Sequence, residues 1–145
     1  MSIKERLQAD LKTAMKAGEK TRLMAIRGVL AEITRVEKDV RREATDDEAI
    51  TVIKRERARR EESLEFARKA ARADLIEQNE TEARVLETYL PAAISADDIR
   101  AAIAELTAGG ANQIGAIMKG LRDRFGAALD GKLASDLARE AISKK

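Results

Sequence analysis

The sequence predicts an all-α protein in which an N-terminal antiparallel long-helix bundle precedes a small C-terminal three-helix domain. Little in its 145 residues interrupts regular structure, since 8 are glycine and 1 is proline. Apolar residues recur at the three- and four-residue intervals of amphipathic helices, and no stretch alternates as a strand does. The single proline, Pro91, lacks a backbone donor and disfavours helical geometry at Leu90. We therefore expect an N-terminal helical domain over residues 1–91 and a C-terminal domain over residues 92–145.

Four helices are expected before Pro91. Ser2 with Glu5 forms a capping-box pattern for the first, which Gly18 ends, and the second runs from near Glu19 to Val40. A second capping box, Thr45 to Glu48, opens the third. The apolar positions of these helices are Ile3, Leu7, Leu11 and Met15; Leu23, Ile26, Leu30, Ile33, Val36 and Val40; Ile50, Ile53, Leu64 and Ala67; and Leu75 or Ile76, Ala83, Leu86 and Leu90.

Two interpretations are open for the boundary between the third and fourth helices. The segment 70–74 contains no helix breaker, so one continuous helix over residues 46–89 is an alternative. We favour a break near Ala71 and Arg72.

Three shorter helices are expected after Pro91. Ser95 with Asp98 predicts the start of the first, which Gly109 and Gly110 close. Asn112 can cap the second, and Asp130 with Gly131 opens the third. Their apolar positions are Ile99, Ile103 and Leu106; Ile114, Ile117, Met118 and Leu121; and Leu133, Leu137 and Ala141.

The composition excludes several classes of chemistry. The chain has no cysteine and no histidine, so thiol nucleophiles, thiolate metal sites and imidazole acid–base catalysis are impossible. We expect no metal site and no cofactor. No apolar run approaches the roughly 20 residues of a membrane-spanning helix, and no signal peptide is visible, so we expect a cytoplasmic protein without a membrane partner. The 28 basic and 26 acidic residues leave a net charge of +2, so nucleic acid could bind only to local clusters of cations.

Four motifs in order resemble the GatB/YqeY family, whose fold is shared by YqeY-like proteins and the tail of the B subunit of the tRNA-dependent amidotransferase. The resemblance covers essentially the whole chain. The family often has glycine where Ala71 stands, an apolar residue at Arg57 and an arginine in the loop before the last helix, which this chain omits. The first motif comprises residues 10–16 and 21–23, and the second comprises residues 59–63 and 72–75. The third is residues 89–91, and the fourth comprises residues 114–119 and 130–133.

The resemblance implies helical architecture and a link to tRNA. It indicates a non-catalytic module associated with tRNA or another RNA, because transamidation and glutamine hydrolysis belong to other parts of the amidotransferase. One alternative is the family-level activity, a carbon–nitrogen ligase with glutamine as amido-N-donor. The other is an adaptor that uses the apolar faces of its first two helices for a protein partner or for self-association.

Two regions could contact RNA. The segment from Lys54 to Arg60 has five basic side chains in seven residues, and Arg59 and Arg60 also lie in a family motif. It could be a phosphate-binding stripe. We favour a solvated helix with Arg57–Glu61 and Glu56–Arg60 ion pairs. Acid pairs such as Asp46-Asp47 are interpreted as helix caps.

The second region lies in the C-terminal domain. Gly115 and Lys119 share a helix face. Together they suit a phosphate contact; alternatively, Gly115 allows tight helix packing and Lys119 is an ordinary surface lysine. Both interpretations stay open. Gly131 and Lys132 suit an anion at a helix start, although a plain Asp-Gly turn is favoured there. We predict that Lys119 and Lys132 contribute more to tRNA affinity than the Lys54–Arg60 cluster, which nearby acids neutralise.

Overall fold

The computed structural model describes residues 1–143, and these residues form an all-α protein, as predicted. None of the described residues lies in a β-strand. The chain divides into two compact units, Met1–Leu90 and Pro91–Lys145. In chain order the elements are α1 (Ile3–Ala17), α2 (Lys20–Val40), α3 (Asp46–Lys69), α4 (Ala73–Glu87), α5 (Ala96–Ala108), α6 (Ile114–Phe125), the short 3₁₀ helix η1 (Gly126–Ala128) and α7 (Gly131–Ser143).

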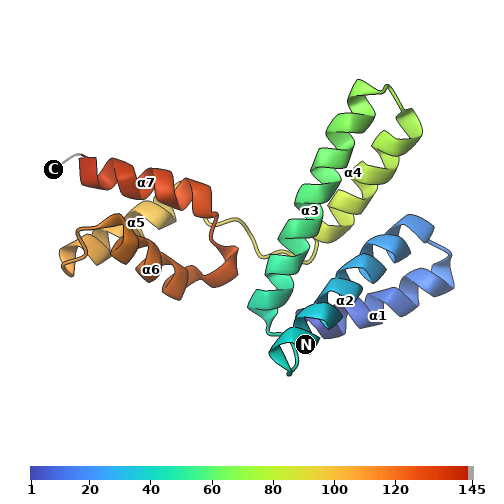
Figure 1. The fold of residues 1–145 in the computed structure, drawn as a ribbon, viewed down its shortest axis with the longest axis horizontal. Coiled ribbons are helices and arrows are strands. Elements are labelled where there is room, and N and C mark those ends of the chain that lie inside the picture. Colours follow the sequence, from blue (N-terminus) through green and yellow to red (C-terminus); the bar gives the residue numbers. More distant parts are fainter. Residues whose placement is uncertain (144–145) are drawn as a thin grey trace. The chain divides into compact units, whose positions relative to one another are not determined.

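The first unit consists of two helical hairpins (Figure 1). α1 pairs with α2, α3 pairs with α4, and α2 packs against both helices of the second hairpin. The core between them is aliphatic and includes Leu7, Ile26, Ile33, Ile53 and Leu86. The apolar faces of α1 and α2 are therefore mostly buried inside their own unit, but Met15 at the end of α1 and Val40 at the end of α2, which the sequence placed on these faces, are 54% and 39% exposed.

The turn between α3 and α4 confirms the predicted break and shows that one continuous helix is wrong. Ala71 adopts a left-handed backbone with φ of 52°. The Arg72 N–H donates to the Ala67 carbonyl oxygen at 3.0 Å, and the Ala71 N–H donates to the Arg68 carbonyl oxygen at 3.1 Å. This is the Schellman arrangement that usually carries glycine. The prediction placed Leu90 on the fourth helix, but α4 ends at Glu87 and Leu90 lies beyond it.

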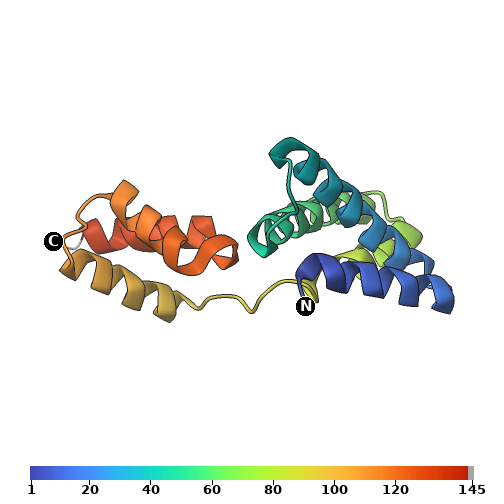
Figure 2. The ribbon, with the colours of Figure 1, turned by 90° about the horizontal axis from the view of Figure 1, so that it is seen from below.

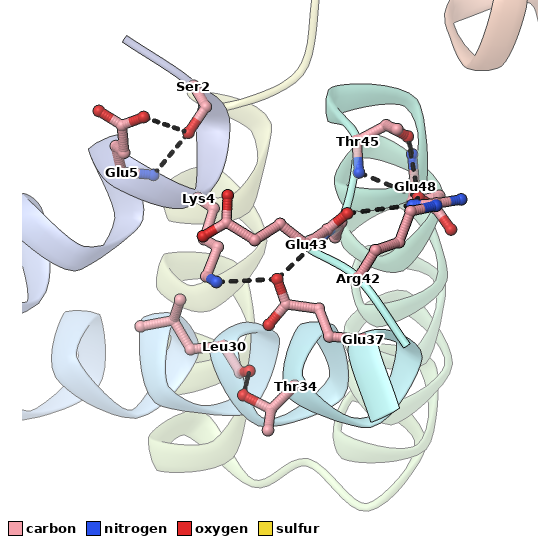
Figure 3. A network of polar contacts seen from close by, with 11 residues as sticks. Ser2, Lys4, Glu5, Leu30, Thr34, Glu37, Arg42, Glu43, Thr45 and Glu48 are labelled. Carbon is pink, nitrogen blue, oxygen red and sulfur yellow. Dashed lines mark hydrogen bonds and ion pairs between the residues drawn. The ribbon is translucent and has the colours of Figure 1, made fainter. Parts of the chain in front are cut away.

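Three helix ends meet around the loop between α2 and α3 (Figure 3). Lys4 Nζ lies 2.8 Å from Glu37 Oε2, and the same carboxylate oxygen accepts the Ala44 N–H at 2.9 Å. The Ile3 N–H donates to Asp46 Oδ1 at 3.0 Å. The hydrogen bond between the two side chains raises the pKa of Lys4 and lowers the pKa of Glu37. These contacts fix the start of α1 against the end of α2 and the start of α3.

The start of α3 carries the complete capping box that the sequence predicts. The Glu48 N–H donates to Thr45 Oγ1 at 3.2 Å, and the Thr45 N–H donates to Glu48 Oε1 at 2.9 Å. Arg42 Nη1 donates to the same carboxylate oxygen at 2.6 Å (Figure 3). The hydrogen bonds from Arg42 and from the Thr45 backbone lower the pKa of Glu48 to about 2.

The capping box predicted at the start of α1 is only half formed. Ser2 Oγ accepts the Glu5 N–H at 3.1 Å, as a serine cap should. The Glu5 carboxylate, however, accepts from the Ser2 hydroxyl at 3.2 Å (Figure 3). The capping box needs that carboxylate at the Ser2 backbone N–H, so the reciprocal half of the motif is missing.

Tyr89 anchors the end of the first unit to α1. Its hydroxyl donates to Asp10 Oδ2, and the guanidinium carbon of Arg6 lies 5.2 Å from the centroid of its ring. Arg6 Nη2 donates to the Thr88 carbonyl oxygen at 3.4 Å, and Arg22 Nη2 lies 3.9 Å from Asp10 Oδ1. Burial, together with the hydrogen bond to Asp10, raises the pKa of Tyr89 well above its usual range.

The second unit packs three helices around one small aliphatic core. Figure 2 shows α5 and α7 running in the same direction, with α6 running back between them in the chain. The predicted serine cap of α5 is confirmed, because Ser95 Oγ accepts the Asp98 N–H at 3.0 Å. The core includes Ile99, Ile103, Ile117, Leu121 and Leu137.

Candidate functional site

One side of α6 is buried and the opposite side presents cations to solvent. Ile117, Met118 and Leu121 face the core of the second unit. Gly115, Lys119 and Arg122 are exposed and follow one another at the four- and three-residue intervals of a single helix face. We call these three residues the α6 face.

The cations of the α6 face are weakly held. Lys119 Nζ lies 3.3 Å from Asp123 Oδ2, and both side chains are largely exposed, at 78% and 68%. Such an exposed pair contributes little to stability and can be exchanged for another partner at small cost. Arg122 makes no ion pair with any residue that the structure describes.

Gly115 is open to solvent, so the interpretation of it as a packing glycine is wrong. A Cβ added at Gly115 would meet no atom within 4 Å. The packing glycine of α6 is Gly120, where an added Cβ would lie 2.5 Å from Leu106 Cδ2 of α5. Gly120 is not among the residues predicted from the sequence, although it lies three residues after Ile117 and one before Leu121, at the edge of the buried stripe.

The start of α6 differs from the prediction. The N-cap is Gln113 rather than Asn112, and its side chain makes no capping hydrogen bond. The first turn contains no acidic residue. The backbone N–H groups of this turn therefore have no side-chain acceptor, and the positive end of the helix dipole next to Gly115 is not neutralised locally.

The start of α7 is already occupied by a carboxylate of the same chain. Asp130 Oδ1 accepts the Lys132 N–H at 3.0 Å and the Leu133 N–H at 3.2 Å. The favoured interpretation, a plain Asp-Gly turn before a capped helix, agrees with these bonds. Gly131 and Lys132 do not form an anion site from free backbone N–H groups. The Lys132 ammonium is exposed and makes no ion pair among the described residues.

Arg60 is a structural residue of the first unit. Its Nη1 lies 3.0 Å from Glu82 Oε2 on α4, and the Glu82 side chain is only 5% exposed. Arg60 Nε is buried and has no hydrogen-bond partner among the described residues. A buried carboxylate needs a paired cation, so Arg60 is not free to bind phosphate. The predicted Glu56–Arg60 pair is absent.

Two further arginines of the Lys54–Arg60 cluster, Arg57 and Arg59, form ion pairs within α3. Arg59 Nη1 lies 2.7 Å from Glu56 Oε1, and Arg57 Nε lies 3.9 Å from Glu61 Oε1, so the predicted Arg57–Glu61 pair is present. Arg59 is exposed, whereas Arg57 is half-buried. The cluster thus resembles a solvated, internally paired helix more than a phosphate-binding stripe.

The described residues offer neither a metal cluster nor a membrane-spanning helix. No group of three or more His, Cys, Asp or Glu side chains among them is placed to hold a metal ion. Within the same residues, no helix is both long enough and apolar enough to cross a bilayer.

The profile of the YqeY-like protein family matches residues 4–142. The chain belongs to the YqeY-like family. This match contains the α6 face, Gly131, Lys132, Arg59 and Arg60, so every proposed RNA contact lies within the family domain.

The chain is also similar to part of a curated protein. The YqeY-like chain is 37% identical over 84 residues to "Altered inheritance of mitochondria protein 41, mitochondrial" from Pyrenophora tritici-repentis (strain Pt-1C-BFP). The aligned region covers 58% of this chain and 46% of the relative, so the match spans about half of the relative's length. The relative's name refers to mitochondria, and the cytoplasmic location expected for the present chain stays a prediction.

Proposed function

We propose that this YqeY-like protein is a non-catalytic helical module that binds tRNA or a similar RNA through the α6 face. One support is the resemblance of its motifs to the tail of the amidotransferase B subunit, whose enzyme acts on tRNA. The observation that carries the proposal is the exposed alignment of Gly115, Lys119 and Arg122, with no side chain covering the backbone at Gly115.

The physical basis is contact with the phosphate backbone. Lys119 and Arg122 supply two cations. An RNA phosphate can replace water around them, or replace Asp123 as the partner of Lys119. Gly115 lets a phosphate approach the first turn of α6, where backbone N–H groups lack a side-chain acceptor. Lys132 would add only its ammonium group, because Asp130 uses the neighbouring N–H groups.

We also propose that the module has no chemistry of its own. Without cysteine or histidine, a ligase using glutamine would depend on carboxylates and lysines for both nucleophile and proton transfer. Purified protein incubated with glutamine, ATP and misacylated tRNA should therefore give no amidated product. Turnover that disappears when one specific acid is replaced would contradict this part of the proposal.

The first prediction compares two matched pairs of cations by fluorescence anisotropy with labelled bulk tRNA over a salt series. Lys119→Ala/Lys132→Ala and Arg55→Ala/Arg59→Ala each remove one ion-paired and one unpaired exposed cation. The first double variant should lose more affinity, and its salt slope should fall by about 1.5, because two phosphate contacts disappear.

Circular dichroism must first show that both double variants keep their helices. A larger affinity loss in Arg55→Ala/Arg59→Ala, or an unchanged salt slope in Lys119→Ala/Lys132→Ala, would contradict the assignment of the RNA contact to the second unit. Absence of any tRNA binding by the unmodified protein at low salt would remove the proposed function itself.

A further inference from the structure

α2 is covered by other helices on one side and exposed on the other. α1, α3 and α4 all pack against its covered side (Figure 1). Exposed residues at intervals of three and four form one face of the helix, which we call the α2 face: Lys20, Met24, Arg27, Ala31, Arg35 and Lys38. Because a helix rises 1.5 Å per residue, the α2 face is about 27 Å long.

The α2 face carries four cations and no carboxylate. Within α2, all of which the structure describes, Asp39 is the single exposed acid. It follows Lys38 and therefore lies about 100° around the helix from the line of the face. Glu32 and Glu37 are half-buried. The exposed residues of segment 55–65 on α3, in contrast, include both signs of charge, as a solvated helix usually does.

The cations of the α2 face are free or weakly held. Lys20, Arg27 and Lys38 make no ion pair with any residue that the structure describes. Arg35 Nη1 lies 3.4 Å from Glu32 Oε1, but the Arg35 side chain is 73% exposed. Such an exposed pair can be exchanged for another partner at small cost. The positive charge of this face is therefore not neutralised within the chain.

Lys38 is the cation of the face with acids in its surroundings. It lines a shallow hollow with Glu37 and Glu43, and it forms no ion pair with either among the described residues. The Glu37 carboxylate binds Lys4 and the Ala44 N–H instead. We therefore expect Lys38 to attract an anion less strongly than the other cations of the α2 face.

We infer that the α2 face is a second contact with the RNA backbone, in addition to the α6 face, and this rests on the proposed function. Lys20, Arg27 and Arg35 lie about 10 to 12 Å apart along the helix axis, so each can meet a different phosphate. The short side chain of Ala31 at the middle of the face lets the backbone of an RNA strand lie close to the helix.

The chemistry of the α2 face disfavours a protein or a membrane as its partner. A protein interface would bury these cations, and burying an unpaired charge is costly. The cores of protein interfaces are accordingly depleted of lysine. A helix that lies on a membrane needs several large apolar side chains, and Met24 is the one large apolar residue of this face. A line of phosphates neutralises exposed cations without burying them in an apolar core.

Fluorescence anisotropy of the full chain with labelled bulk tRNA over a salt series tests the inference. Lys20→Ala/Arg27→Ala/Lys38→Ala should weaken binding by about tenfold or more. Its salt slope should fall by about 2, because three phosphate contacts disappear. An unchanged salt slope in this triple variant would overturn the inference.

The matched control is Lys12→Ala/Arg55→Ala/Lys69→Ala. It also removes two lysines and one arginine that are exposed and make no ion pair among the described residues, but none of them lies on the α2 face. It should weaken binding by less than about threefold. Both triple variants should keep their helical circular dichroism, since the side chains are exposed and alanine favours a helix. An equal or larger loss in the control would overturn the inference.

Cross-linking locates the contact directly, because the chain has no cysteine of its own. Met24→Cys, which places a thiol on the α2 face, should cross-link to tRNA when it carries a photoactivatable group. Phe66→Cys on α3 is the control and should not cross-link. Met24 is 56% exposed and Phe66 is 72% exposed, so both positions accept the label. Cross-linking from Phe66→Cys alone would contradict a contact at α2.

The outcomes distinguish this inference from the proposed function. If the unmodified chain does not bind tRNA, both fail. If Lys119→Ala/Lys132→Ala weakens binding and Lys20→Ala/Arg27→Ala/Lys38→Ala does not, the α2 contact alone fails. The reverse result supports the α2 face and removes the α6 face. Binding to phosphatidylserine vesicles that needs the three α2 cations, with tRNA affinity unchanged in their absence, would overturn the inference in favour of a membrane surface.

Discussion

The two units use their ion pairs differently. In the first unit, Lys4–Glu37 and Arg60–Glu82 join different helices and are largely withdrawn from water, whereas Arg68–Glu80, which joins α3 to α4, is exposed. In the second unit, most described pairs, such as Lys119–Asp123, join residues three or four apart within a single helix, and their side chains are exposed. Arg124–Glu105, which joins α6 to α5, is the exception, and it is also exposed.

This difference shows which cations are available for function. Breaking a buried pair leaves an uncompensated charge, so Lys4 and Arg60 are committed to the fold. An exposed pair within one helix contributes little, so the cations of the second unit can turn to a new partner almost freely. Local density of basic residues, highest at residues 54–60, is therefore a poor guide to the binding surface.

The largest expected effect tests the structural role of Arg60. Arg60→Ala should destabilise the first unit by about 3 kcal/mol, because it leaves the buried Glu82 carboxylate without its cation. Urea unfolding followed by the fluorescence of Tyr89, the single tyrosine in a chain without tryptophan, measures this unit.

Arg59→Ala is the matched control for Arg60→Ala. It removes the adjacent arginine, whose pair with Glu56 lies within one helix, and should change stability by no more than about 0.5 kcal/mol. Equal losses in the two variants would show that the cross-helix pair has no special role.

Tyr89→Phe should have the next largest effect. The substitution keeps the buried ring and removes the hydrogen bond to the Asp10 carboxylate, a charged acceptor, at a cost of about 1.5 kcal/mol. Urea unfolding followed by circular dichroism measures it, since the fluorescent group is lost. Asp10→Asn should give a similar loss, and a double variant should add little, because both changes break one interaction.

The pH dependence of the first unit should show the contribution of Glu48. The pKa of Glu48 is about 2 in the folded protein, against an ordinary value of 4.5, so its contribution to stability is present above about pH 4.5 and is lost as the pH falls towards 2. Glu48→Gln should be less stable than the unmodified chain at neutral pH, and the difference should shrink on acidification. Glu62→Gln, at an exposed position of α3, is the control and should show no such change.

The smallest predicted effects compare two glycines of α6. Gly115→Ala should stabilise the second unit by about 0.5 kcal/mol, because the added methyl lies in open space and alanine favours a helix. Gly120→Ala should destabilise it by about 1 kcal/mol, since Leu106 must move to admit the methyl group. Amide NMR signals of α6 during a urea titration distinguish the two. Equal shifts in the same direction would contradict the packing role of Gly120.

Much of the fold could be predicted because its signals are local. Gly18, with φ of 68°, ends α1 as expected, and the caps at Ser95 and Thr45 depend on residues three positions apart. The turn at Ala71 was harder, since a Schellman turn without glycine carries no distinctive residue. Its left-handed backbone is held by hydrogen bonds to Ala67 and Arg68, which are visible only in three dimensions.

The candidate site was less predictable because its meaning depends on partners far along the chain. Arg59 and Arg60 are adjacent in sequence, yet Arg59 pairs within α3 and Arg60 pairs with Glu82, 22 residues away. No local pattern distinguishes them. Gly115 and Gly120 likewise differ only in what faces them, and Leu106 lies on another helix.

The contact between Tyr89 and Asp10 has a consequence for how the first unit folds. It joins residues 79 positions apart, whereas the α3–α4 hairpin closes through the short turn at Ala70 and Ala71. Contacts of long sequence separation close the largest loops, so we expect the two hairpins to form early and this contact to form last. The same contact should open first in the native state, exposing the amides near Tyr89 to solvent exchange while the α3–α4 hairpin stays closed.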